Sequence, residues 1–191
     1  SSAGQAPVTT LDLQNPEVAI VLNTLREVNK IVQAEGWSFN IEKHYELQAD
    51  SETFKIPYPT NALAIDTHVD QYYDDFDAVR RDGYLYDKHE HTFEWKDGSD
   101  ARKLVCDIIW YWEFSEIPPA VQAYITARAA RLCAIRMIGD QTLYALLEKS
   151  EIESRAAALE HETQQGDYSI FGWKEKENYH NSYQPFHALQ R

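Results

Sequence analysis

The stretch His89-Glu90-His91 contains the residues whose types and spacing come closest to a metal site. Residues two apart on a strand point to the same side, so both imidazoles would face one ion. Asp87 or His68 could supply a third ligand. A charged strand exposed to solvent beside a turn explains the same residues. We therefore predict no metal, and we retain His89 and His91 only as the candidate ligands.

Carboxylates are dense between Asp66 and Asp100, a stretch that contains eleven acidic residues and only four basic ones. Pairs such as Asp74 and Asp75 have the residue types of general acid–base catalysis, but they also belong on any solvated acidic surface. The sequence contains no glycine-rich phosphate loop, Gly-x-Ser-x-Gly, Cys-x-x-Cys or His-Glu-x-x-His motif. We predict no catalytic residue and no cofactor. A glycan- or metal-dependent hydrolase using this acidic region is the alternative.

Arg128 and Arg131 stand in a segment, residues 117–139, that is apolar on both flanks. A guanidinium held among apolar residues needs a carboxylate partner. We predict that both arginines form ion pairs, either within a helical bundle or with a neighbouring subunit. Cys106 and Cys133 also lie in apolar contexts, which favours free buried thiols over a disulfide or a nucleophile.

Periodicity predicts three helices. Apolar residues recur every three or four positions over 16–35, after a capping Asn15, and Gly36 ends this helix. The segment 117–139 begins with prolines and ends at a glycine, as a second helix would. Its nearly continuous apolar surface predicts that the rest of the chain surrounds it. A third helix follows and runs to about residue 165.

Between the first two helices the apolar period changes from 3.6 to 2, which is typical of strands. Alternation begins at Trp37 and continues to Leu47. It returns at 54–58, 62–66, 84–86, 92–95 and 103–112. The turn sequences 81–83 and 96–98 separate neighbouring segments, as in hairpins. These segments predict an antiparallel β lobe inserted between the helices.

The predicted fold class is α+β, mainly α: a helical bundle with an inserted antiparallel β lobe and an extended C-terminal arm. A strap and the first helix occupy 1–36, the β lobe 37–116, two long helices 117–166 and the arm 167–191. The arm carries six aromatic residues without a period. They are Tyr168, Phe171, Trp173, Tyr179, Tyr183 and Phe186. So much apolar surface predicts an interface with a neighbouring subunit or another partner.

Length and composition limit the function classes. A chain of 191 residues, of which 43% are hydrophobic, suffices for one domain with a core. It has no apolar run near the roughly 20 residues of a membrane span, so we expect no membrane partner. The formal charge of −13 argues against nonspecific nucleic-acid binding through the outer surface.

Eight short motifs, in order along the chain, resemble the tail tubular protein A (tail adaptor) family of T7-like short-tailed bacteriophages. They cover nearly the whole chain to Phe171. The motifs are Gly4–Val8, Val32–Asn40, Ile56–Leu63, Gly83–Asp87, Ile117–Pro119, Tyr124–Arg131, Gly139–Asp140 and Gly166–Phe171. Any one of them is weak evidence, whereas the ordered set is specific.

The resemblance implies a structural virion protein that is made in the bacterial host cytoplasm and built into a short tail. The family forms dodecameric rings that join the capsid portal to the tubular nozzle, tail tubular protein B. Double-stranded DNA passes through the ring without specific binding, and tail fibres are a further partner to consider. The resemblance also implies that the aromatic arm contacts the portal or a neighbouring subunit. Family members usually have a further helix before the motif Gly4–Val8, which this sequence does not include.

Overall fold

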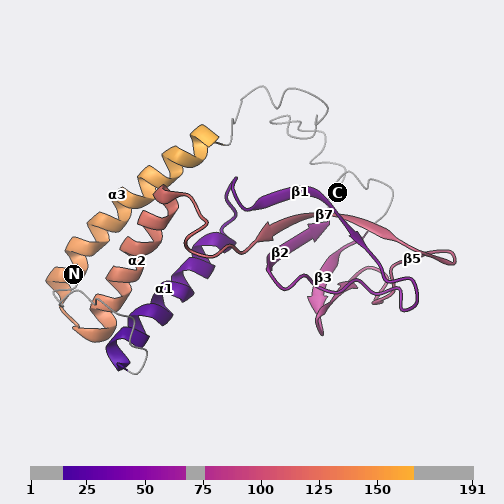
Figure 1. Cartoon of the computed structure of the whole chain (residues 1–191), viewed down its shortest axis with the longest axis horizontal. Helices are drawn as coiled ribbons and strands as arrows, with labels where there is room; N and C mark the ends of the chain where they lie inside the picture. Colours follow the sequence, from indigo (N-terminus) through magenta and orange to yellow (C-terminus); the bar gives the residue numbers. More distant parts are fainter. Residues whose placement is uncertain (1–14, 68–75, 166–191) are drawn as a thin grey trace.

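The computed structural model describes residues 15–67 and 76–165. It confirms the α+β, mainly helical fold class. Helices α1 (Pro16–Ala34), α2 (Pro119–Met137) and α3 (Gln141–Gln165) lie side by side in one layer, with α2 between the other two (Figure 1). The β lobe lies beyond α1, which contacts two of its strands.

Both ends of α1 follow the predicted signals. The side chain of Asn15 accepts a hydrogen bond from the Glu17 backbone N–H at 3.0 Å, and Pro16 begins the first turn. Gly36 follows the helix with a φ of 78°, a conformation that glycine adopts without strain. A Cβ on Gly36 would lie 3.1 Å from Cδ1 of Ile109, so this glycine also permits close packing on the lobe.

The central helix α2 buries only part of its surface. Val121, Tyr124 and Ile125 are fully buried against α1 and α3. Ile135 and Ile138, near its C-terminal end, remain 52% and 44% exposed. The expectation that the chain surrounds this helix on all sides is therefore wrong, because the two neighbouring helices lie in one layer with it.

The lobe is built on a three-stranded antiparallel sheet with the strand order β1-β7-β2. Its strands are β1 (Ile41–Gln48), β2 (Ala62–Thr67) and β7 (Lys103–Trp110). Two hairpins complete the lobe. They are β3 (Ala78–Arg81) with β4 (Tyr84–Asp87), and β5 (Lys96–Asp97) with β6 (Asp100–Ala101). A second core forms here around the buried side chains of Ile56, Leu85, Trp95, Leu104 and Ile108.

Three predicted strand segments are not strands. Residues 37–40 form a turn, in which the Asn40 backbone N–H donates to the Trp37 carbonyl at 3.0 Å. Residues 54–58 and 92–95 contribute only isolated bridges, at Pro57 and Thr92. Alternation over four or five residues is too short to distinguish a strand from a turn whose aromatic side chains are buried.

No helix within 15–67 and 76–165 combines the length and the apolar character that a membrane crossing requires.

Candidate interaction surfaces

His89 and His91 lie in an exposed turn after β4, which corrects the strand geometry predicted for them. The Asp87 carboxylate accepts a hydrogen bond from the His89 backbone N–H at 2.8 Å, and His91 has a φ of 55°. The alternation of a strand therefore does not apply here. Within the described ranges, no three His, Cys, Asp or Glu side chains are arranged to hold a metal ion. Three further candidates fall outside the described residues: His68, Asp74 and Asp75.

The hydrolase alternative requires acids that converge in a concave site with raised pKa values. Asp87, Glu90 and Glu94 do border one hollow of the lobe. The hydrogen bond and charge of Lys96, however, lower the pKa of the Glu94 carboxyl. This shift is opposite to the one that a general acid needs, and it marks Glu94 as half of a surface ion pair.

The two cysteines are free and buried, as predicted. Burial raises the pKa of the Cys106 thiol to about 12, and burial also raises the pKa of Cys133. Both thiols therefore stay protonated at neutral pH, whereas a nucleophilic cysteine must ionise readily. Cys106 lies in the core of the lobe and Cys133 is buried on α2, which indicates a packing role for each.

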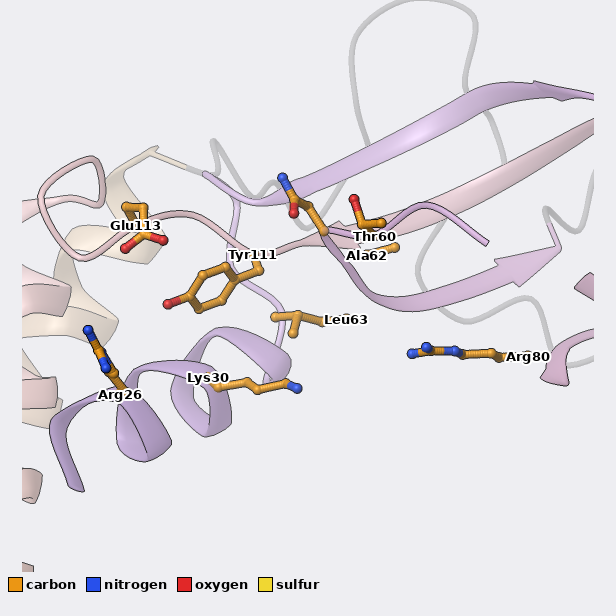
Figure 2. A pocket seen from close by; sticks show the side chains of 9 residues that line it. Arg26, Lys30, Thr60, Ala62, Leu63, Arg80, Tyr111 and Glu113 are labelled. Atoms are coloured by element: carbon orange, nitrogen blue, oxygen red, sulfur yellow. The ribbon is translucent and has the colours of Figure 1, made fainter. Parts of the chain in front are cut away.

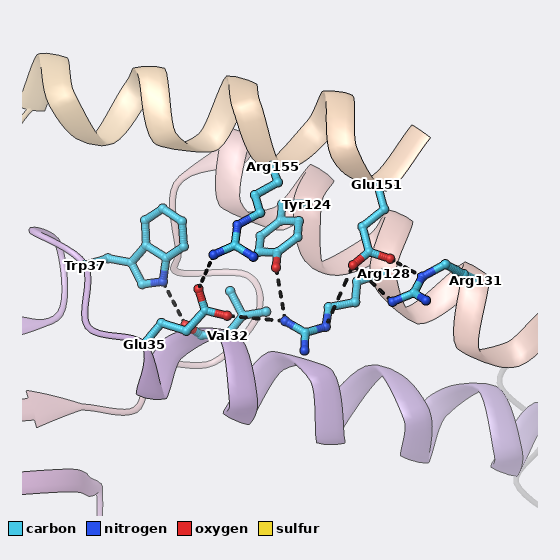
Figure 3. Close-up of polar contacts among 8 residues, drawn as sticks. All are labelled: Val32, Glu35, Trp37, Tyr124, Arg128, Arg131, Glu151 and Arg155. Carbon is cyan, nitrogen blue, oxygen red and sulfur yellow. Dashed lines mark hydrogen bonds and ion pairs between the residues drawn. The ribbon is translucent and has the colours of Figure 1, made fainter. Parts of the chain in front are cut away.

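Arg128 and Arg131 form ion pairs within the helical layer (Figure 3). Nη1 of Arg128 lies 3.2 Å from Oε1 of Glu35, at the end of α1, and donates to the Tyr124 hydroxyl at 3.0 Å. Nε of Arg128 lies 4.0 Å from Oε1 of Glu151 on α3. Arg131 contacts the same Glu151 carboxylate through Nε and Nη2. The two arginines thus connect all three helices.

The network continues beyond these pairs. Glu35 also lies 3.6 Å from Nη2 of Arg155 on α3, and Arg131 donates to the Tyr144 hydroxyl. The Glu151 side chain is 14% exposed and that of Arg131 18% exposed, so these charges depend on each other more than a surface pair does. Hydrogen bonding to Glu151 raises the pKa of Arg131 still further.

Glu151→Gln is expected to lower the free energy of unfolding by about 2 kcal/mol, because it removes the one carboxylate that Arg131 contacts. Arg128→Met is expected to lower it by only about 1 kcal/mol, because Glu35 keeps Arg155 as its partner. Urea denaturation of both variants tests this order. The exposed Glu153→Gln serves as the control on α3. Equal losses for the two variants would contradict the prediction.

Two buried amides join α1 to the lobe, and sequence analysis did not single them out. Nε2 of Gln33 donates to the Trp112 carbonyl, and its Oε1 accepts from the Trp112 N–H, both at 2.8 Å. Oδ1 of Asn40 accepts from the Trp37 N–H at 2.8 Å, and its Nδ2 donates to the carbonyls of Gln33 and Trp110 at 2.9 Å. The available signal was a glutamine next to Val32 on the apolar side of a helix.

A hollow of about 500 Å³ lies where α1 meets the lobe (Figure 2). Arg26 and Lys30 line it from successive turns of α1, and Arg80 lines it from β3. Figure 2 shows the ammonium of Lys30 and the guanidinium of Arg80 directed toward each other from opposite walls. Tyr111 and Glu113 line it from the segment that follows β7. The hollow therefore has three cationic side chains and one acid.

One side of α3 is apolar and exposed. Ala145, Ile152, Ala156 and Leu159 recur at helical spacing on a side turned away from the buried Ala158, and we call these four residues the α3 stripe. Ile152 is 64% exposed and Leu159 46% exposed. Exposed apolar side chains that recur on one side of a helix make that side a candidate interaction surface.

The six aromatic residues of the predicted arm fall outside the described residues, so their interface stays a prediction. They are Tyr168, Phe171, Trp173, Tyr179, Tyr183 and Phe186.

A helical layer with exposed apolar residues on α3, together with an attached β lobe, is an arrangement that suits a structural subunit. The model of the tail tubular protein family matches residues 1–168, and the chain belongs to this family. The protein is therefore a structural component of a phage tail, from a family that is typically non-enzymatic. The family match confirms the resemblance carried by the ordered motifs. No curated protein matches the chain.

Proposed function

We propose that the protein is the ring-forming tail adaptor, which joins the capsid portal to the tubular nozzle and lines the DNA ejection channel. The observation that carries this proposal is the α3 stripe. In water, Ile152 and Leu159 keep much of their apolar surface exposed. Burying side chains of this size contributes about 1.5–3 kcal/mol each, which is a strong drive toward association.

The occupant that we propose for the α3 stripe is a second copy of this chain. α1 forms the opposite edge of the helical layer, and its Ile20 and Ile31 are 42% and 44% exposed. When two different edges of one molecule are complementary, each copy binds the next head to tail. Such contacts close into a ring when the rotation between copies fits, and the family resemblance gives twelve copies.

The proposal assigns each predicted region a place in the virion. The helices of 1–36 and 117–166 form the ring body with the lobe of 37–116 attached, and the arm 167–191 contacts the portal or a neighbouring subunit. The nozzle, tail tubular protein B, docks on the opposite side, where tail fibres are a further partner. The formal charge of −13 suits a channel wall, because like-charge repulsion keeps a DNA duplex from adhering during ejection.

Native mass spectrometry of the purified chain, alone and with its portal, tests the adaptor proposal. We expect a discrete closed assembly of twelve copies that binds the portal ring. Negative-stain images of the same sample should show an open channel. A chain that stays monomeric at every concentration, both with and without the portal, would rule out the ring-forming role.

A further inference from the structure

The hollow between α1 and the lobe is a positively charged site in a strongly acidic protein. Its lining includes three cationic residues, Arg26, Lys30 and Arg80, and a single acid, Glu113. The whole chain, by contrast, carries a formal charge of −13. Like charges gathered around one hollow repel each other, which raises the free energy of the empty site. An anionic group placed between them would remove that repulsion.

Most other cations of the described chain already have a partner. Arg128, Arg131 and Arg136 form ion pairs with glutamates, and Lys88 and Lys103 pair with acids on the lobe. Among the residues that the structure describes, no carboxylate lies within 4 Å of the cationic groups lining the hollow. Arg80 instead stacks over the Tyr58 ring, with its guanidinium carbon 4.8 Å from the ring centroid. This stacking fixes the guanidinium at the edge of the hollow.

We propose that this hollow, the cationic socket, binds the acidic tip of the β5–β6 hairpin of a second copy of the chain. The proposal rests on the ring-forming function and names a contact within the ring. The tip consists of residues 97–100, in which the exposed Asp97 and Asp100 flank a turn at Gly98. In the described part of the chain neither aspartate has an ion-pair partner.

The position of the hairpin supports this choice of occupant. Figure 1 shows β5 projecting from the end of the lobe that points away from the helices, whereas the socket lies where the lobe meets α1. A projecting anionic tip and a recessed cationic socket at different places on one molecule cannot satisfy each other within that molecule. Between copies they form a heterologous contact, the type that generates rings.

Carboxylates suit the socket better than DNA phosphates. A duplex presents its phosphates on a convex rod, while the socket is a recess of about 500 Å³ that also contains Glu113. The net charge of −13 on the whole chain would repel a DNA duplex more strongly than a short hairpin with two charges. The side-chain oxygens of aspartate can instead accept hydrogen bonds from arginine and lysine inside the recess.

Charge reversal tests the contact. We expect Arg26→Glu with Lys30→Glu to raise the concentration needed for ring assembly by about tenfold or more, since each contact then repels. Adding Asp97→Lys and Asp100→Lys should restore assembly in the same chain. The control Lys88→Glu with Lys103→Glu makes the same change in net charge outside the socket and should assemble like the unmodified protein. Thermal melting of the monomers verifies that every variant folds. If the Arg26→Glu, Lys30→Glu variant does not fold, the neutral variant Arg26→Gln with Lys30→Gln takes its place.

Three results would overturn the socket proposal. The first is normal assembly of the Arg26→Glu, Lys30→Glu variant. The second is a tip reversal that fails to rescue it. The third is an Arg26→Glu, Lys30→Glu variant that assembles normally but binds a short DNA duplex less tightly than the unmodified protein does, as measured by fluorescence anisotropy. That result would assign the socket to DNA.

A disulfide test separates this proposal from the ring itself. Oxidising a chain with Lys30→Cys and Ser99→Cys should cross-link neighbouring copies, while Lys103→Cys with Ser99→Cys should not. If the unmodified chain forms no closed ring but the first pair still cross-links, the socket stands and the adaptor ring fails. If rings form without any cross-link, the ring stands and the socket fails.

Discussion

The variant Ile152→Lys with Leu159→Lys is expected to remain a folded monomer and to form no ring. Both side chains lie on the exposed α3 stripe, so their replacement removes nothing from either core. In the proposed ring each contact would lose about 1.5–3 kcal/mol of apolar burial per residue and would bury an unpaired ammonium as well. Every contact of a ring is identical, so one sequence change acts on all of them.

Sedimentation velocity of the stripe variant measures this loss directly. The control Glu153→Lys with Glu160→Lys places two lysines at the same spacing, one position further along the helix, and should retain assembly. Circular dichroism should give the same helix content for both variants. Rings formed by the stripe variant at the concentration that suffices for the unmodified protein would show that α3 faces solvent in the assembly.

Asn40→Leu is expected to lower the free energy of unfolding by about 3–5 kcal/mol. The change leaves the Trp37 N–H and the carbonyls of Gln33 and Trp110 without their side-chain partner in a region where Asn40 is 1% exposed. Each unsatisfied buried group costs about 1–3 kcal/mol. Against a total stability of roughly 5–15 kcal/mol, such a loss moves the unfolding midpoint to a clearly lower urea concentration.

Tryptophan fluorescence reports the Asn40 transition, because Trp37 adjoins the substituted side chain. Asn23→Leu is a matched control on an exposed position of α1 and should change stability by less than about 0.5 kcal/mol. A loss below about 1 kcal/mol for Asn40→Leu would mean that water replaces the lost hydrogen bonds.

The helices could be predicted from sequence because their signals are local. The cap at Asn15, the prolines at 16 and 119, and the glycines at 36 and 139 each act within one turn of the residues they order. Strands 62–67 and 103–110 were also recognisable, since they alternate over enough residues to define a period. The four-residue turn at 37–40 was not, because two alternating aromatic residues fit both structures.

The candidate sites were much less predictable, because their parts are distant in the chain. The type of Arg128 indicated that it needs an acid, but its partner Glu35 is 93 residues away. The cationic socket joins side chains from α1, β3 and the segment after β7, and no local pattern links them. Gln33 and Asn40 appear as ordinary polar residues until the lobe brings Trp112 and Trp110 beside them.

In the sequence the lobe comes after α1 and before the helices that complete the layer, and this order affects how the chain is synthesised. Val28 and Val32 of α1 pack against Val121 and Tyr124 of α2, which the ribosome adds only after the whole lobe. At roughly 5–20 residues per second, α1 waits for several seconds with its apolar side uncovered. Folding of the lobe shortens the effective loop that must close, because Gln33 then binds Trp112 just ahead of α2.

The same order delays contact between nascent chains. The α3 stripe is made after α1 and α2, so a chain cannot present it to a neighbour while it still lacks its own central helix. The order of translation therefore sets the time at which this contact between copies can form. Each chain has made its first two helices before it acquires the surface through which it would recruit the next.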